Sequence, residues 1–234
     1  MWNHHPKGFC MSWSFPSEIV CPLFPQGCLV RHIPVKRIFD ICFSITALIC
    51  GAPLFLLIAL AIRLSSQGES FYAHERVGRG GKSFKCYKFR TMYANSDKRL
   101  QKLLDKDPLL KKEWEETYKL KNDPRITPVG AFLRKTSLDE LPQFFNVITG
   151  ELSVVGPRAL VREEVAQYLG HKAMKILSVR PGLTGLWQTS GRSNTSYDTR
   201  IRLDEYYINH QSFLFDLVLI IKTIPVMIFC RGAY

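Results

Sequence analysis

The chain has 234 residues, of which 46% are hydrophobic, and it carries 32 lysines and arginines against 20 acidic residues. This length accommodates one sizeable domain, and the formal charge of +12 indicates an anionic partner: nucleic acid, a phosphorylated substrate or a membrane surface. The seven cysteines form no recognisable disulfide framework, so we interpret them as reduced and cytosol-facing, which argues against a disulfide-stabilised secreted domain.

Residues 1–35 scatter Trp, Phe, Pro, Cys and His without a helical or strand period, and we expect a poorly ordered leader there. The His and Cys spacings match none of the usual zinc-ligand patterns. No apolar stretch leads to a small-residue cleavage site, so the segment does not resemble a signal peptide.

The strongest hydrophobic segment, residues 38–64, is long enough to cross a bilayer. Asp40 and Ser44 lie near its start, and Pro53 lies at its middle. Cations flank both ends, and because Lys and Arg mark the cytoplasmic side, both ends are expected to stay there. Because proline kinks a helix, residues 36–65 suit a re-entrant helix that turns at Pro53. A single kinked span and a buried soluble helix remain alternatives on these residues alone.

Residues 71–92 place aromatic and cationic side chains around a turn, which predicts a hairpin whose cations can meet phosphates. The segment 81–83 looks like the end of a phosphate-binding P-loop, but that motif needs a glycine where Arg76 stands. Residues 96–121 carry leucines at helical spacing and a break at Pro108, which predicts a charged, mostly solvated helical region.

Residues 134–143 place the adjacent carboxylates of Asp139 and Glu140 after two cations and before Pro142. Because proline lacks an N–H group, it fits the first turn of a helix, which puts the carboxylates near the N-cap and the positive end of the helix dipole. A carboxylate held there stays ionised and suits a nucleophile or a Mg²⁺ ligand. A plain capping box between Ser137 and Glu140 explains the same pattern without chemistry.

Two glycine-containing segments follow. Residues 151–158 predict a short strand and a tight turn that holds Arg158, whose planar guanidinium matches a phosphate, although a surface salt bridge is the alternative. Residues 180–192 alternate glycine with hydrogen-bonding side chains, which favours close approach to a ligand. Trp187 in this loop suits either stacking on a base or packing in the core.

Helices complete the C-terminal part of the chain. We predict an amphipathic helix at 160–177, a polar helix at 197–210 and an apolar helix at 213–229. The last carries Asp216 and Lys222 and is slightly short for a membrane span. This combination favours a helix packed in the core or lying at the membrane interface.

Seven motifs, taken in order, resemble those of the bacterial sugar transferase family, the monotopic polyprenyl-phosphate phosphoglycosyl transferases. They span residues 34–234 and occupy positions 36–40, 75–78, 87–92, 122–125, 137–143, 155–158 and 181–185. Segments 185–188 and 231–234 are most similar to the branch that transfers galactose 1-phosphate at the start of O-antigen and capsule synthesis.

The resemblance implies a mainly helical α+β fold: a compact catalytic domain with short strands, a re-entrant membrane helix and interfacial amphipathic helices. The division would be a leader at 1–35, the re-entrant helix kinked at Pro53 over 36–65, and a cytoplasmic catalytic domain over 66–234. Long family members carry an additional N-terminal membrane bundle, so we expect this chain to correspond to their catalytic part with a short leader. The expected location is the bacterial inner membrane, with the catalytic domain on its cytoplasmic face.

The reaction implied by the resemblance transfers a sugar 1-phosphate from a UDP-sugar to undecaprenyl phosphate. Asp139 would be the nucleophile that forms a phosphosugar–enzyme intermediate, and Glu140 would assist it by holding Mg²⁺ or moving a proton. Mg²⁺ is the expected cofactor, with Asp139 and Glu140 as its candidate ligands. The other candidate site residues bind phosphate or nucleotide: Lys88, Arg134 and Arg158 for phosphate, and Gln188 and Arg192 for nucleotide.

Galactose is the expected sugar, with glucose and then an N-acetylated sugar as alternatives, because spacing does not place the few hydrogen bonds that read sugar stereochemistry. Ala159 stands where the family usually has a proline, which loosens that turn slightly but leaves Arg158 in place. The oligomeric state stays open, a homodimer included. Two other classes of function compete: a non-enzymatic protein that holds anionic membrane lipid, and a nucleic-acid binder. The second lacks a recognisable fold motif and gives residues 38–64 no role, so we expect no nucleic-acid partner.

Overall fold

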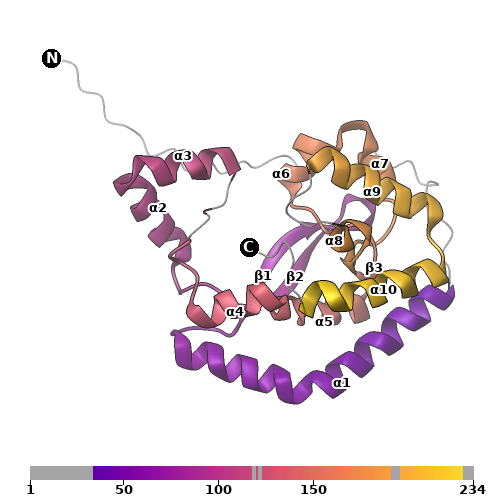
Figure 1. The fold of residues 1–234 in the computed structure, drawn as a ribbon, viewed down its shortest axis with the longest axis horizontal. Coiled ribbons are helices and arrows are strands. Elements are labelled where there is room, and N and C mark those ends of the chain that lie inside the picture. The colour runs from indigo at the N-terminus through magenta and orange to yellow at the C-terminus, as the bar shows by residue number, and fades with distance from the viewer. Residues whose placement is uncertain (1–33, 118–119, 121–122, 191–195, 229–234) are drawn as a thin grey trace.

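The computed structural model describes residues 34–117, 120, 123–190 and 196–228. It is mainly helical with short strands, which confirms the predicted fold class (Figure 1). The principal elements in chain order are α1 (Pro34–Ser65), β1 (Phe71–Val77), β2 (Ser83–Phe89), α2 (Ser96–Lys106), α3 (Pro108–Thr117), α4 (Pro128–Thr136), the 3₁₀ turn η2 (Leu138–Glu140), α5 (Gln143–Thr149), β3 (Ser153–Val155), α6 (Arg162–Glu164), α7 (Ala173–Ile176), β4 (Gly182–Thr184), α8 (Leu186–Thr189), α9 (Tyr197–His210) and α10 (Phe213–Ile228). The expectations for residues 1–33 and for Arg192 fall outside the described residues.

The apolar segment forms one long helix, α1, which contains Pro53 and bends near its middle (Figure 1). Among the described residues, α1 is the one helix that is long and apolar enough to cross a membrane. Its exposed large side chains are Val35, Ile38, Ile45, Ile49, Leu54, Leu56, Leu57, Leu60 and Leu64. Because so large an apolar surface is unfavourable in water, it favours contact with lipid.

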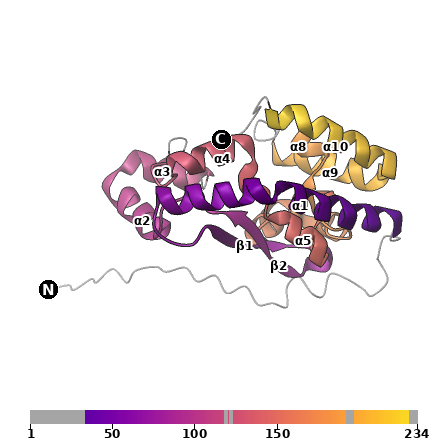
Figure 2. The same cartoon turned by 90° about the horizontal axis from the view of Figure 1, so that it is seen from below.

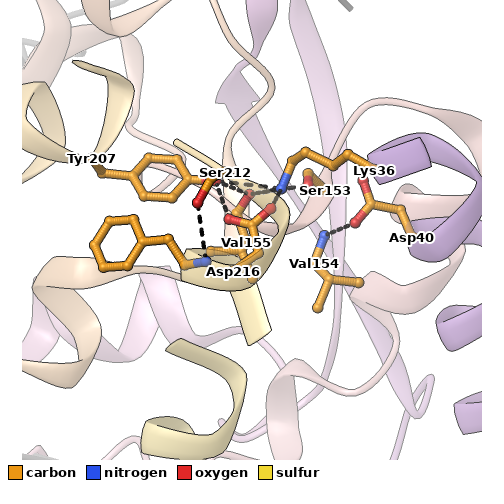
Figure 3. A network of polar contacts seen from close by, with 9 residues as sticks. Lys36, Asp40, Ser153, Val154, Val155, Tyr207, Ser212 and Asp216 are labelled. Atoms are coloured by element: carbon orange, nitrogen blue, oxygen red, sulfur yellow. Dashed lines mark hydrogen bonds and ion pairs between the residues drawn. The ribbon is translucent and has the colours of Figure 1, made fainter. Parts of the chain in front are cut away.

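A network of polar contacts fixes the N-terminal end of α1 to the rest of the domain (Figure 3). Lys36 of α1 pairs with Asp216 of α10, and its ammonium group also donates to the hydroxyl of Tyr207 at 3.3 Å. Asp40, one turn further along, accepts the backbone N–H of Val154 at 3.0 Å. The helix that carries the apolar surface is therefore held rigidly against β3, α9 and α10.

Two small sheets lie beside the helices. β1 and β2 pair antiparallel over their full length, which confirms the predicted hairpin. β3 and β4 pair in parallel, with Ser153 opposite Gly182. A Cβ atom on Gly182 would lie 2.1 Å from the backbone nitrogen of Gly156, so only glycine permits this crossing. The crossing sets the path of the turn that carries Arg158.

The expectation of a single amphipathic helix over residues 160–177 is wrong. The structure has the short helices α6 and α7, with a π turn at Val165–Leu169 and a 3₁₀ turn at Gly170–Lys172 between them. Gly170 adopts a φ of 47°, a left-handed value that a right-handed helix cannot continue through. The segment 180–192, expected as a loop, contains β4 and α8.

The described residues form two hydrophobic cores, and the acidic turn η2 packs against the smaller one. The larger core packs α5, β3, α7, α9 and α10 around the fully buried Val147, Leu152 and Leu219. The smaller core joins α1, β2 and α4, and Leu138 and Leu141 pack against it. Because these two leucines flank Asp139 and Glu140 in the chain, the smaller core fixes the turn that carries the carboxylates.

Candidate active site

The acidic pair sits in a turn of its own between two helices. α4 ends at Thr136 and is capped by Ser137, which adopts the left-handed conformation with φ 59°. Asp139 and Glu140 then form the 3₁₀ turn η2, and α5 begins only at Gln143, after Pro142. The prediction that the carboxylates lie at the N-cap of a helix with Pro142 in its first turn is therefore wrong by about one turn.

The alternative of a plain capping box also fails. The side chain of Ser137 makes no capping hydrogen bond, and only the backbone N–H of Glu140 reaches the Ser137 carbonyl, at 3.3 Å. The Glu140 carboxylate points elsewhere and pairs with cations of the hairpin and of the turn after β3. The Glu140 side chain therefore forms ion pairs with residues of other elements and does not cap a helix.

Two cationic side chains converge on the acidic pair. Lys88 of β2 donates to Glu140 Oε1 at 2.6 Å and lies 3.8 Å from Asp139 Oδ2. The guanidinium of Arg158 lies 3.4 Å from the same Glu140 oxygen. Glu140 is therefore held closely by Lys88 and more weakly by Arg158, whereas Asp139 has one long contact with Lys88.

The environments of the two carboxylates push their pKa values in opposite directions. Burial raises the pKa of Asp139; Lys88 opposes this rise, and the neighbouring Glu140 adds to it. Burial alone would also raise the pKa of Glu140, but Lys88 and Arg158 outweigh it, so this pKa lies well below its ordinary value. Glu140 thus favours its ionised form and anchors cations, whereas Asp139 is a more basic, poorly solvated carboxylate, which suits a nucleophile.

A cavity of about 840 Å³ opens onto the acidic pair. Its volume falls in the range that holds small-molecule ligands and cofactors. Its wall from α10 and its neighbours is apolar and includes Phe43, Phe144, Ile220, Ile224 and Met227. Its basic lining consists of Arg76, Lys88, Arg90, Arg125, Arg134 and Arg158. The site therefore combines a strongly cationic region, suited to phosphates, with an apolar flank.

Two other predicted site residues, Arg134 and Gln188, line the cavity without contacting the acidic pair through an ion pair or hydrogen bond among the described residues. Arg134 lines the cavity, and its Nε donates to Thr91 Oγ1 at 2.9 Å. Gln188 is 7% exposed and lines the cavity, and neither polar atom of its amide has a hydrogen-bond partner among the described residues. Such a buried, unpaired amide is costly unless a ligand completes it.

The polar residues of the cavity that sequence reasoning did not assign to the site include His74 and Arg76 of β1. Both alternate along one face of the hairpin, and this period of two was the signal that identifies them. Burial lowers the pKa of His74, and Arg76 and Lys88 lower it further, so its imidazole is neutral among cations. Arg200 was also missed, and no motif marked it.

Asp139 and Glu140 suit Mg²⁺ only if substrate phosphates supply further ligands. Among the described residues, no three His, Cys, Asp or Glu side chains gather in a metal-binding group. Asp139 and Glu140 are adjacent, and the single long contact of Asp139 leaves its oxygens able to accept another ligand. Mg²⁺ at phosphoryl-transfer sites is commonly held by one or two carboxylates together with phosphate oxygens and water. Two carboxylates in a phosphate-sized cationic cavity match this pattern.

Comparison with known proteins gives the same assignment as the motifs. The family model described as bacterial sugar transferase matches residues 31–230. The exopolysaccharide production protein ExoY of Sinorhizobium fredii is 50% identical over 199 residues, which are 85% of this chain and 88% of the relative. The undecaprenyl-phosphate galactose phosphotransferase of Salmonella typhimurium is 47% identical over 225 residues, which are 96% of this chain and 47% of that protein. The UDP-glucose:undecaprenyl-phosphate glucose-1-phosphate transferase of Escherichia coli is 38% identical over 212 residues, 88% of this chain and 42% of the relative.

Proposed function

The chain belongs to the bacterial sugar transferase family, and from this premise we propose that it transfers a sugar 1-phosphate from a UDP-sugar to undecaprenyl phosphate, the first step in building a surface polysaccharide. The observation that carries the proposal is the placement of Asp139 and Glu140 at a cavity lined by six basic side chains. Relatives named for this transfer are 47% and 38% identical to the chain over most of its length.

In the first step, a carboxylate oxygen of Asp139 attacks the phosphorus that bears the sugar. A bond forms between Asp139 and this phosphorus, and the bond from phosphorus to the bridging oxygen of the diphosphate breaks. UMP leaves with that oxygen and its electron pair, and the sugar phosphate stays on Asp139. The burial of Asp139 favours this attack, because a poorly solvated carboxylate is a stronger nucleophile than one fully hydrated by water.

The cations of the cavity make the attack of one anion on another possible. Lys88 lies between the two carboxylates, and Arg158 faces the same side of Glu140, so both are placed to neutralise the donor phosphates. Glu140 holds these two cations in place while Asp139 reacts. Mg²⁺ bound by Asp139 or Glu140 would supply further neutralisation of the diphosphate charge.

In the second step, a phosphate oxygen of undecaprenyl phosphate attacks the same phosphorus and displaces Asp139. The product is an undecaprenyl diphosphate sugar, and the Asp139 carboxylate is regenerated. Because the donor leaves before the lipid reacts, the water-soluble and lipid substrates never need to occupy the cavity together. The apolar wall formed by Ile220, Ile224 and Met227 of α10 offers a surface for the first isoprene units.

We propose that the chain lies at the cytoplasmic face of the bacterial inner membrane. α10 lies beside the N-terminal half of α1 (Figures 1 and 2), and both helices expose large apolar side chains. The bend in α1 at Pro53 favours a helix that enters one leaflet and returns. On α10 the exposed apolar side chains are Leu214, Val218, Ile221 and Ile224, at helical spacing that suits a helix lying in the interface.

Galactose is the proposed sugar. The relative named for galactose 1-phosphate transfer is 47% identical, against 38% for the relative named for glucose 1-phosphate transfer. Glucose is the second candidate and an N-acetylated sugar the third. The choice depends on hydrogen bonds to sugar hydroxyls, for which the neutral His74 and the unpaired amide of Gln188 are the suitable partners in the cavity.

The test is release of UMP by the purified full chain in detergent with Mg²⁺ and undecaprenyl phosphate. UDP-galactose, UDP-glucose and their N-acetylated counterparts are supplied in parallel, and the lipid product is identified by mass spectrometry. We expect release that requires the lipid and Mg²⁺, with the highest kcat/KM for UDP-galactose. Turnover of UDP-glucose alone would replace the proposed sugar, and no lipid-linked product from any donor would overturn the proposed reaction.

A further inference from the structure

Two guanidinium groups share one aromatic ring beside the acidic pair. Trp187 of α8 lines the cavity. The Cζ atom of Arg158 lies 5.6 Å from the centroid of the Trp187 ring, and that of Arg200, from α9, lies 4.6 Å from it. Both distances are within the range of a cation–π interaction. The ring that the sequence suggested as a platform for a nucleotide base is thus in contact with two cations.

The stack of Arg200, Trp187 and Arg158 connects the interior of the domain to the acidic pair. Arg158 reaches Glu140 Oε1 at 3.4 Å, and its side chain is one-third exposed to the cavity. Arg200 is 7% exposed, and Asp204, one helical turn later on α9, is 3% exposed. The contacts therefore run from the buried Arg200 through the Trp187 ring to Arg158, which in turn reaches Glu140.

The arrangement is costly for the fold. Burial lowers the pKa of Arg200, and the charge of Arg158 lowers it further, because the two cations repel each other across the ring. One terminal nitrogen of Arg200 and Oδ1 of Asp204 are buried without a hydrogen-bond partner among the described residues. Stability alone gives no reason to gather these charges, since apolar side chains of similar volume fill a core at lower cost.

The contact between Glu140 and Arg158 is weak, so Arg158 needs a second group to fix its orientation. Glu140 Oε1 already accepts a 2.6 Å hydrogen bond from Lys88, and its contact with Arg158 is long. When a diphosphate enters, Arg158 must turn part of its fork from Glu140 to the phosphate. An indole face fixes the plane of the guanidinium without occupying its N–H groups, so the fork stays oriented during this exchange.

We propose that Trp187 and Arg200 are positioning residues that orient the guanidinium of Arg158 toward the donor diphosphate, the ring directly and Arg200 through the ring. The inference deepens the proposed function and rests on it for the identity of the ligand. It assigns no contact with substrate to Arg200. On this proposal, Trp187 affects binding and turnover of the UDP-sugar only through Arg158.

A double-mutant cycle tests this with the full chain in detergent. Trp187→Leu and Arg158→Lys are made singly and together, because lysine keeps the charge at 158 but has no planar fork to orient. Arg200→Met is paired with Arg158→Lys in the same way. Two quantities are measured for each protein: kcat/KM for the UDP-sugar, and the Kd of UDP by calorimetry. Tyr206→Leu is the matched control, since it removes a ring stacked on His210 on the exposed side of α9.

We expect Trp187→Leu to lower kcat/KM and UDP affinity by about tenfold and Arg200→Met by about fivefold, in line with a desolvated cation–π contact. In the Arg158→Lys background, both effects should shrink to less than about twofold, because coupled residues are not additive. Trp187→Phe should recover most of the loss, and Tyr206→Leu should change neither quantity.

Equal effects of Trp187→Leu in both backgrounds would overturn the inference, because they would show a role independent of Arg158. If Trp187→Leu lowers the melting temperature too far to assay, the same comparison is made with Trp187→Phe and Arg200→Lys, and additivity there would overturn it equally. Failure of the wild type to turn over any UDP-sugar would overturn the proposed function instead, and the UDP-binding cycle would still decide the inference. A wild type that binds no UDP would overturn both.

Discussion

Two clusters in this molecule contain the same types of side chain, but one stabilises the fold and the other faces the candidate active site. In each, a lysine approaches a buried carboxylate: Lys36 meets Asp216 in the network at the base of α1, and Lys88 meets the Asp139–Glu140 pair at the cavity. The first cluster is closed. Asp216 also accepts the Tyr207 hydroxyl at 2.7 Å, and its side chain is 3% exposed (Figure 3).

The second cluster is open. Asp139 has one contact of 3.8 Å with a cation, Arg158 is one-third exposed, and the group faces a cavity of about 840 Å³. Both clusters pair lysine with carboxylates, so residue type alone does not distinguish the structural cluster from the candidate catalytic one. The difference is whether the polar groups satisfy one another or leave capacity for a ligand.

The largest effect we expect is loss of turnover in Asp139→Asn. The amide keeps the size of the side chain but is a far poorer nucleophile, so kcat should fall by about 10⁴-fold, as when other enzymes lose a covalent nucleophile. UMP release in detergent is the measurement, and the melting temperature should stay near that of the wild type.

The matched control for this change is Asp105→Asn on α2, which alters an exposed aspartate that pairs with Gln101. It should leave kcat unchanged. A fall in kcat of Asp139→Asn smaller than about tenfold would mean that the open cluster does not contain the nucleophile.

Asp216→Asn should show the reverse behaviour. It leaves Lys36 partly buried beside a neutral amide, so the free energy of unfolding should drop by about 3 kcal/mol. For a chain of this size that corresponds to a fall in melting temperature of roughly 6–12 °C. Thermal unfolding in detergent checks the shift, and kcat per folded molecule should stay within about twofold of wild type.

A large loss of kcat in Asp216→Asn without any fall in melting temperature would contradict the comparison. It would place the closed network in the reaction rather than in the fold. The variant Tyr207→Phe sharpens this point, because it removes only the hydroxyl that Asp216 accepts.

Asp204→Asn should change how stability depends on pH. Burial raises the pKa of Asp204 to about 7, against opposing effects of Arg200 and Arg158, from an ordinary value of 3.8. The folded protein therefore keeps a proton that the unfolded chain releases, so the stability is fully present below pH 3.8 and is lost as pH rises through 7. The variant removes this loss, which amounts to about 1.4 kcal/mol for each unit by which the pKa in the folded protein exceeds that in the unfolded chain.

The measurement is the difference in melting temperature between Asp204→Asn and wild type at pH 5 and at pH 8. The difference should be more positive at pH 8, where the wild-type carboxylate must ionise in the interior. Equal differences at the two pH values would show that Asp204 does not retain its proton above its ordinary pKa.

The smallest effect belongs to a pair that is neither closed nor functional. Glu205 of α9 accepts a hydrogen bond from Lys172 at 2.7 Å at the surface. Glu205→Gln should change the free energy of unfolding by no more than about 0.5 kcal/mol and leave kcat alone. A shift in melting temperature above about 4 °C would show that, in this protein, the exposure of an ion pair does not predict its contribution to the free energy of unfolding.

The sequence predicted the elements that depend on local pattern. The hairpin, the break at Pro108 and the helix at 197–210 all follow from nearby residues, and the structure contains each of them. The motif at 137–143 also identified the two carboxylates that the structure places at the cavity.

What the sequence left out depends on distant contacts. The π turn and the left-handed Gly170 broke a segment whose apolar period alone predicted one helix. The acidic pair moved from a helix start to a separate turn because Leu138 and Leu141 pack into the smaller core. Arg200 reaches the site only through a ring 13 positions earlier in the chain, a relation that no spacing encodes.

Trapping the covalent intermediate tests the proposed role of Asp139 most directly. The wild type is incubated with UDP-galactose and Mg²⁺ without undecaprenyl phosphate, quenched, and analysed by intact mass and peptide mapping. We predict one added hexose phosphate per chain, located on Asp139, which disappears when undecaprenyl phosphate is added. A hexose phosphate on any other residue, or release of UMP at the wild-type rate by Asp139→Asn, would contradict the central claim that Asp139 carries the sugar phosphate between its two partners.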